Sequence, residues 1–253
     1  MSAASAEPLL RLAGVHTHIG AYHILHGVDF DVSTGQVTML LGRNGAGKTT
    51  TLRTIMGLWA ASRGNVMFDG QAIGGEKGQR RTPDIAQLGI AYVPENMGIF
   101  SDLTVRENLL LAARGARSIE QIDTRRLDWL FGLFPAIRKF WLYPAGKLSG
   151  GQKQMLAIAR AMVEPRRLLL IDEPSKGLAP AIVQNLITAL RELKATQTTV
   201  LLVEQNFAMA KALGDQVAVM DDGRVVHRGE MAELAEDESL QHKLLGLSLG
   251  AHQ

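Results

Sequence analysis

Short, nearly uninterrupted apolar runs are the clearest pattern along the chain. They cover residues 37–41, 90–93, 168–171 and 199–203, and polar or turn-forming residues bound each of them. Apolar runs of this length, without alternation, are typical of strands that are buried on both faces of a parallel sheet. The pattern therefore predicts buried strands at these places.

Helical periodicity separates the last two runs. Pro180 is typical of a helix start, and the residues that follow have a helical spacing of apolar positions. A strand, a helix and a strand in this order predict two parallel strands joined by a right-handed crossover. The apolar positions that share one helical face between residues 181 and 194 are Ile182, Leu186, Ala189, Leu190 and Leu193.

Near the two ends of the chain, short β segments run into turn-forming residues, which favours antiparallel hairpins. These turn signals lie at Ser33-Thr34-Gly35, Asp69-Gly70 and Asp221-Asp222-Gly223. Between about residues 94 and 164 the spacing of apolar residues becomes helical. Residues 230–247 are expected to form a short helix.

A phosphate-binding loop follows the strand at residues 37–41. The segment Gly42-Arg43-Asn44-Gly45-Ala46-Gly47-Lys48-Thr49-Thr50 fits the pattern G-x-x-x-x-G-K-[ST], and a helix is expected from Thr49 to Leu58. Glycines allow backbone N–H groups to surround a polyphosphate at a helix N-terminus. Lys48 would neutralise the β- and γ-phosphates, and the Thr49 hydroxyl would bind Mg²⁺. A glycine-rich turn that matches by chance is the alternative.

Two carboxylates end the apolar run at residues 168–171. Asp172 and Glu173 would lie at the carboxyl edge of the parallel sheet, where α/β folds bind ligands. After a phosphate loop, this pattern predicts that Asp172 binds Mg²⁺ and that Glu173 polarises a water at the γ-phosphate. Two solvated acids at the tip of an ordinary strand are the alternative.

Together these elements predict an α/β fold. It consists of a P-loop NTPase core with a mainly parallel sheet, an N-terminal antiparallel β subdomain and an inserted helical subdomain. We expect a single domain over residues 1–253. Residues 1–93 and 165–253 would form the core with its antiparallel β subdomain, and residues 94–164 the helical subdomain.

Composition narrows the class of protein but not its function. The chain has 253 residues, of which 46% are hydrophobic and 21% charged, and a formal net charge of +2. This is the balance of a globular domain. The basic residues are not concentrated in one part of the chain, so a nucleic-acid partner is not expected. The absence of cysteine excludes disulfides and thiolate metal sites. No signal peptide or long apolar stretch is visible, so membrane contact is expected through a partner.

A serine-glycine segment narrows the function. Leu148-Ser149-Gly150-Gly151-Gln152, together with the phosphate loop and the acidic pair, resembles the ATP-binding cassette (ABC) family over nearly the whole chain. The resemblance implies that two cassettes pack head to tail with ATP and Mg²⁺ between them. Ser149, Gly150, Gly151 and Gln152 would then contact the nucleotide of the partner cassette. A glycine-rich cap that serves only its own helix is the alternative.

Several positions depart from the family pattern, and two of them fall in the predicted site. Glu95 occupies the place of a glutamine, and it would still reach the metal shell through its carboxylate oxygens. Gln205 occupies the place of a histidine that touches the γ-phosphate, and its amide could donate the same hydrogen bond. Both are therefore expected in the site.

The aromatic residue that stacks on adenine in this family is missing at its usual place. Alignment on Leu25 puts Ile19 there. His18 or Tyr22 would have to take over this contact, and we name Tyr22 as the candidate.

Several motifs together are similar to the ATPase subunits of branched-chain amino acid importers, the LivF-like branch. They are Val93-Pro94-Glu95, Glu173-Pro174-Ser175 with Gly177-Leu178-Ala179-Pro180, and Val203-Glu204-Gln205-Asn206, whereas Lys176 is unusual there. The resemblance implies an ATPase that energises an importer from the cytoplasmic face of the inner (plasma) membrane. Its partners would be a second ATPase subunit, identical or homologous, transmembrane permease subunits and, indirectly, a solute-binding protein.

Other functions on the same architecture remain open. An exporter would use the same cassette, because the membrane partner sets the direction of transport. Translation or DNA-maintenance ATPases of this family usually carry two cassettes or a long coiled-coil insert, and neither is visible.

Four histidines cluster in the sequence at His16, His18, His23 and His26. We expect them to be exposed strand or loop residues, because no thiol or carboxylate stands at ligand spacing. A metal site is the alternative.

Overall fold

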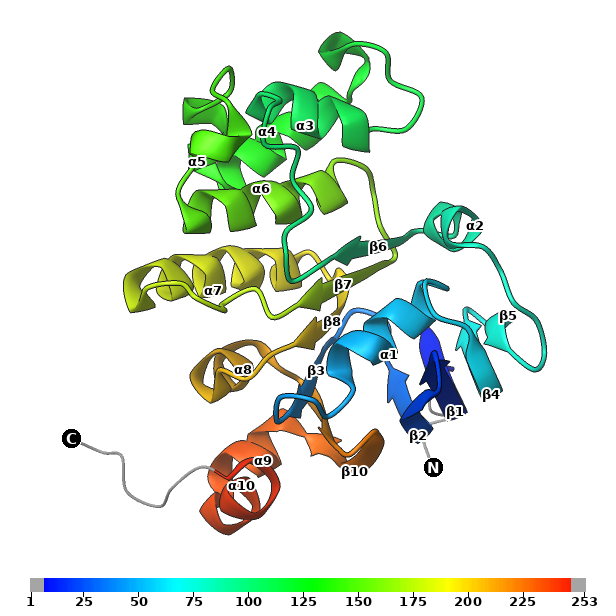
Figure 1. The fold of residues 1–253 in the computed structure, drawn as a ribbon. Coiled ribbons are helices and arrows are strands. Elements are labelled where there is room, and N and C mark those ends of the chain that lie inside the picture. The colour runs from blue at the N-terminus through cyan, green and yellow to red at the C-terminus, as the bar shows by residue number, and fades with distance from the viewer. Residues whose placement is uncertain (1–6, 247–253) are drawn as a thin grey trace, which may run out of the picture.

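The computed structural model describes residues 7–246, and a six-stranded sheet forms its centre (Figure 1). The strands lie in the order β10-β9-β3-β8-β7-β6. β9 and β10 are antiparallel and the other neighbours are parallel, as the sequence predicts. The strands are β3 (Val37–Gly42), β6 (Ile90–Val93), β7 (Leu168–Asp172), β8 (Thr199–Val203), β9 (Gln216–Asp221) and β10 (Arg224–Glu230).

The apolar runs form strands because both faces of this sheet are covered. In β7, Leu168 and Leu170 belong to one core, whereas Leu169 and Ile171 belong to the core on the opposite face. A strand buried on both faces has no solvent side, which is why its sequence does not alternate. The prediction of buried strands is confirmed.

A second, antiparallel sheet has the order β2-β1-β4-β5. Its strands are β1 (Leu10–Ile19), β2 (Tyr22–Val32), β4 (Ala61–Phe68) and β5 (Gln71–Gly75). The hairpin at Asp69-Gly70 is confirmed. The expected hairpin at residues 33–35 is wrong, because this turn leads from β2 into β3 of the other sheet. β2 already pairs with β1, and the fully buried β3 needs the central sheet as its environment.

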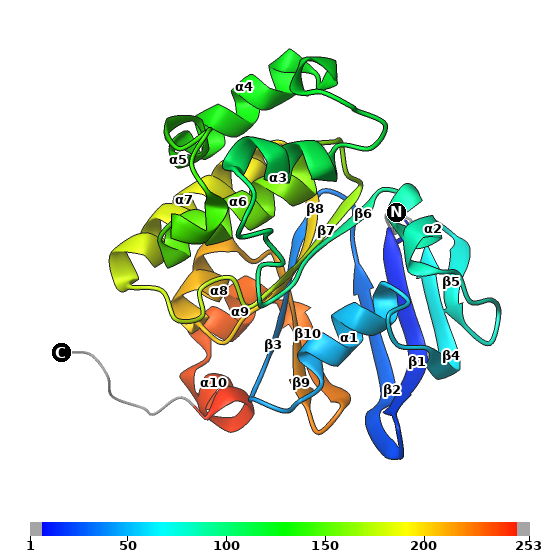
Figure 2. The same ribbon diagram turned by 45° about the horizontal axis from the view of Figure 1, so that its top comes forward.

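Helices cover both faces of the central sheet. α1 (Lys48–Ile55) contacts β2 and β5 on one side and β3 and β7 on the other, so it lies between the two sheets (Figure 2). Its start is one residue earlier and its end three residues earlier than expected. α2 (Thr82–Gln87) precedes β6. α7 (Pro180–Ala195) and α8 (Phe207–Leu213) pack on the opposite face, which confirms the amphipathic helix after Pro180.

The chain between β6 and β7 forms the helices at the top of Figure 1. They are α3 (Val105–Ala112), α4 (Thr124–Leu133), α5 (Pro135–Lys139) and α6 (Gly150–Met162), with 3-10 turns at Ile119–Gln121 and Ala145–Lys147. The subdomain limits at residues 94 and 164 remain predictions.

The last helical segment differs from the expected single helix over residues 230–247. It consists of α9 (Met231–Glu236) and α10 (Glu238–Leu245), and residue 247 lies outside the described residues. The break is at Asp237, whose side chain accepts a hydrogen bond from the Leu240 N–H and so caps a new helix. Within residues 7–246, no helix combines the length and the hydrophobicity needed to cross a bilayer.

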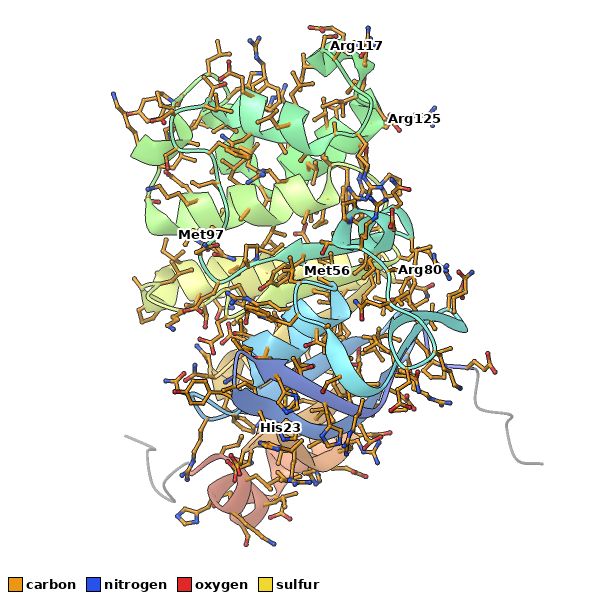
Figure 3. The ribbon with its side chains drawn as sticks, turned by 45° about the vertical axis from the view of Figure 1, so that its right-hand side comes forward. His23, Met56, Arg80, Met97, Arg117 and Arg125 are labelled. Carbon is orange, nitrogen blue, oxygen red and sulfur yellow. The ribbon has the colours of Figure 1, made fainter. Side chains whose placement is uncertain are left out.

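The four clustered histidines come together on the β1–β2 hairpin. Neighbouring rings of the cluster have centroid separations of 4.1 to 5.2 Å, and Figure 3 shows His23 against the strands of the antiparallel sheet. Burial, followed by the nearby His23 and Arg63, lowers the pKa of His16 from its ordinary value. Across residues 7–246, no group of three or more His, Cys, Asp or Glu side chains is arranged to hold a metal ion.

Acidification is expected to destabilise the protein through His16. A histidine whose pKa is lower in the folded state favours the neutral form. Its contribution to stability is therefore complete above the unfolded pKa of about 6.5 and is lost as the pH falls below that value through the lower pKa of the folded state. Thermal unfolding at pH 7.5 and 5.5 measures this loss, which should be smaller in His16→Gln. The exposed His242 provides the control, and an equal effect of His242→Gln would contradict the assignment.

Candidate active site

The phosphate loop joins β3 to α1 in a conformation that requires glycine at its end. Gly47 is the N-cap of α1 and has a φ of 99°. A β-carbon at Gly47 would lie 2.9 Å from Leu25 Cδ2, so both the backbone angle and the space exclude a side chain. No side chain caps this helix start. The first N–H groups of α1 are therefore available to an anion.

Lys48 is buried under this loop. Its Nζ donates hydrogen bonds to the carbonyl oxygens of Gly42 at 2.9 Å and Arg43 at 3.0 Å, and it lies 3.5 Å from Glu173 Oε1. Only 4% of its side chain is exposed. The ammonium thus holds the loop in a curved shape and faces the carboxyl end of β7.

Asp172 and Thr49 offer oxygen ligands of the kind that Mg²⁺ prefers. The Thr49 hydroxyl donates to Asp172 Oδ1 at 3.1 Å, and the Tyr92 hydroxyl donates to Oδ2 at 3.2 Å. Burial raises the pKa of Asp172, and the two hydroxyl donors oppose this rise. A carboxylate beside a hydroxyl at the phosphate loop suits a cation that also takes oxygens from phosphate and water.

Glu173 and Gln205 meet in front of the loop. Glu173 follows the end of β7 with a φ of 45°, and its N–H donates to the Val203 carbonyl at 2.9 Å. Gln205 Nε2 donates to Glu173 Oε1 at 2.6 Å and to Asn44 Oδ1 at 2.7 Å. The Gln205 amide therefore connects the phosphate loop to the carboxylate after β7.

Lys48, Thr49 and Glu173 line one pocket with a volume of about 360 Å³. Glu95, after β6, is among its lining residues, and Asp172 is fully buried nearby. Gly42, Arg43, Asn44 and Gln205 line an adjoining pocket, while Ala46 is buried. The larger pocket is lined by Ile24, Asn44, Gly45, Gly47, Lys48, Thr49, Thr50, Glu95, Glu173 and Lys176.

The serine-glycine segment lies at the start of α6 and does not line that pocket. The Ser149 side chain accepts from the Gln152 N–H, and the Gln152 side chain accepts from the Ser149 N–H at 2.9 Å, which forms a capping box. A β-carbon on Gly151 would lie 2.3 Å from Ile182 Cγ2, so glycine allows α6 to pack closely on α7. Ser149 and Gly150 are exposed.

Comparison with known families agrees with this geometry. The profile described as ABC transporter matches residues 25–176, which include the phosphate loop, the serine-glycine segment and the acidic pair.

The chain belongs to the ABC transporter family.

Curated relatives of this ABC chain match it over nearly its whole length. The branched-chain amino acid transport ATP-binding protein BraG of Pseudomonas aeruginosa is 37% identical over 94% of this chain and 100% of its own. A probable branched-chain amino acid transport ATP-binding protein, LivF of Archaeoglobus fulgidus, is 36% identical over 94% of this chain and 99% of its own.

Solved ABC structures share the fold. CbiO1 of Clostridium perfringens, part of the ABC transporter complex cbiONQ, matches with a TM-score of 0.80 and 25% identity over 94% of both chains. An ATP-binding subunit of an ABC transporter matches with a TM-score of 0.76 and 30% identity over 94% of this chain and 96% of that one. The ABC ATPase fold expected from the sequence is thus confirmed.

The hairpin that approaches the phosphate loop presents an aliphatic residue there. Ile24 lines the pocket, whereas Tyr22 lies at the hairpin tip with 76% of its surface exposed. Ile19 and Tyr22 are opposite each other at this tip. The stacking of Tyr22 on adenine stays a prediction, and the position of Ile24 in the pocket was not predicted from the sequence.

The role of Glu204 in this ABC site was not predicted from the sequence either. Glu204 is 2% exposed and accepts four hydrogen bonds, from the N–H and hydroxyl of Ser175 and from the N–H groups of Gln205 and Asn206. It therefore fixes the segments after β7 and β8 to each other. The sequence signal that could have indicated this role is the position of the Glu204 carboxylate, directly after the buried run at residues 199–203.

Replacing Glu204 with glutamine is expected to destabilise the fold by about 1–3 kcal/mol, because an amide NH₂ would face backbone donors. Turnover should fall as well, since Gln205 loses its anchor. Urea unfolding and phosphate release measure the two effects. Glu192→Gln, at an exposed position on α7, is the matched control. Unfolding free energies equal to wild type in both variants would contradict the role of Glu204.

Proposed function

We propose that this protein is the ATP-hydrolysing subunit of an importer for branched-chain or related amino acids. The observation that carries the hydrolytic role is the position of Glu173, whose Oε1 lies 3.5 Å from Lys48 Nζ and 2.6 Å from Gln205 Nε2 in the phosphate-loop pocket. The substrate class is supported by the BraG and LivF relatives, which match along almost their entire length.

Each residue has a defined task in this proposal. The loop N–H groups and Lys48 bind the triphosphate and neutralise it. Glu173 orients a water molecule and accepts its proton while the water oxygen attacks the γ-phosphorus, which yields ADP and phosphate. The Gln205 amide donates to the γ-phosphate and so links phosphate binding to the position of Glu173.

The residues that would hold Mg²⁺ are Thr49 and Asp172, with Glu95 as a further candidate. When bound, the ion would offset the negative charge that develops during phosphoryl transfer.

A second cassette is expected to complete the site. Ser149 and Gly150 are exposed at the start of α6 and do not line the phosphate-loop pocket of their own chain. In a head-to-tail pair, the segment from Ser149 to Gln152 would face the nucleotide of the partner. ATP would then stabilise the closed pair by binding it more tightly than the open one.

The permease subunits are proposed to dock beside residues 96–100, at the cytoplasmic face of the membrane. Phe100 is 49% exposed, and the Arg160 guanidinium lies 5.0 Å from its ring centroid. Figure 3 shows Met97 at the level between α6 and the central sheet. The exposed ring of Phe100 and the partly buried thioether of Met97 suit contact with an apolar helix end.

Reconstitution tests this function. Vesicles that contain the permease subunits, both ATPase subunits and the solute-binding protein should take up radiolabelled leucine, isoleucine or valine only with ATP, and should release phosphate. Uptake of a different solute would reject the proposed substrate class. Outward transport would indicate an exporter, and the absence of phosphate release would reject the ATPase role.

A further inference from the structure

Two carboxylates leave the central sheet at the same level. β6 and β7 are parallel, with Val93 opposite Ile171. Glu95 and Glu173 each lie two residues beyond this pair, so both emerge at the carboxyl edge of the sheet. Carboxylates in one site repel each other unless a cation compensates them.

A turn after β7 brings a lysine to both of them. The Lys176 N–H donates to the Glu173 carbonyl at 3.2 Å, which closes the turn. The Lys176 side chain then extends back, with its Nζ 2.5 Å from Glu95 Oε1 and 3.6 Å from Glu173 Oε2. One ammonium group is therefore within ion-pair distance of both carboxylates.

The two oxygens of Glu173 face two different lysines. Oε1 lies 3.5 Å from the buried Lys48, and Oε2 faces Lys176 from the other side. Lys48 and Lys176 line the same pocket as the phosphate loop. The carboxylate assigned to the water molecule is thus held between two cations, of which only Lys48 belongs to the phosphate-loop motif.

We propose that Lys176 is a positioning residue for hydrolysis. Its ammonium holds Glu95 and Glu173 at a fixed separation, so that Glu173 stays aimed at the terminal phosphate. The inference rests on the proposed ATPase function and extends it to a residue that departs from the LivF-like sequence pattern.

Because Lys176 is exposed, a role in positioning Glu173 can be distinguished from a contribution to the stability of the fold. Its side chain is 55% exposed and that of Glu95 is 41% exposed. Ion pairs at such positions contribute little to stability. A change at Lys176 is therefore expected to alter turnover and to leave the unfolding temperature near that of wild type.

Steady-state ATP hydrolysis by the assembled transporter tests the proposal. The single variants are Lys176→Met, Lys176→Arg and Glu95→Gln, and a double variant combines Glu95→Gln with Lys176→Met. Lys176→Met should reduce kcat about 10-fold, with KM for ATP within about twofold, because Glu173 loses its alignment. Lys176→Arg should retain at least about half of the wild-type kcat, since the charge remains. The double variant should exceed Lys176→Met about threefold, because the neutral amide at position 95 no longer repels Glu173.

Lys77→Met, at an exposed lysine in the turn after β5, is the control and should match wild type. The inference is overturned if Lys176→Met retains the wild-type kcat, if Lys176→Arg is as slow as Lys176→Met, or if the double variant is no faster than Lys176→Met. A lower kcat that follows a lower unfolding temperature would also overturn it. Wild-type protein that releases no phosphate would instead reject the ATPase function, and this inference with it.

Discussion

Replacing Glu173 with glutamine should lower ATP turnover by at least about 100-fold, the usual contribution of a general base. Glutamine keeps the shape of the side chain but cannot accept the proton of the attacking water. ATP affinity should change by less than about threefold, because the phosphate contacts of the loop and Lys48 remain. Phosphate release and equilibrium binding of ATP measure the two quantities separately.

The exposed Glu192 again offers a matched change, and Glu192→Gln should hydrolyse ATP at the wild-type rate. Wild-type turnover in Glu173→Gln would remove the assignment of Glu173 as the base. A loss of ATP binding as large as the loss of turnover would mean that Glu173 serves binding rather than the proton transfer.

Replacing Lys48 with methionine should weaken ATP binding about 10- to 100-fold, since hydrogen bonds to charged groups contribute about 1.5–3 kcal/mol. The change also removes the donor to the Gly42 and Arg43 carbonyls, which lie at 2.9 and 3.0 Å from Nζ. The loop then loses the interaction that keeps it curved before the nucleotide arrives. Titration with ATP, followed by calorimetry, gives the affinity directly.

Lys77→Met removes a lysine outside the pocket and should leave ATP affinity unchanged. If Lys48→Met bound ATP as tightly as this control, the phosphates would not lie against the loop as proposed. Equal losses in both variants would point to a general charge effect instead of a contact.

The buried strands and the site motifs were predictable because their signals are local. Residues 168–171 are apolar without alternation, and the structure buries successive side chains on opposite faces. The phosphate loop and the pair Asp172 and Glu173 follow such strands directly. Parallel pairing then brings the ends of these strands to one edge.

Features that depend on partners far apart in the sequence were not predictable. The turn at residues 33–35 has the composition of a hairpin turn. It instead connects the two sheets, because β2 pairs with β1 in the antiparallel sheet and β3 lies in the central sheet. Glu204 resembles any acid at a strand end until Ser175, 29 residues earlier, is found beside it. The ion pairs of Lys176 become apparent only when the register of β6 and β7 places Glu95 next to Glu173.

Sedimentation velocity with the Glu173→Gln variant tests most directly whether two cassettes share the nucleotide. The sample would contain the variant alone or together with the second ATPase subunit of its transporter, with and without ATP. The account predicts that ATP converts separate chains into a species of about twice the 27.5 kDa chain mass in at least one of these samples. Chains that remain single at saturating ATP in both samples would contradict it.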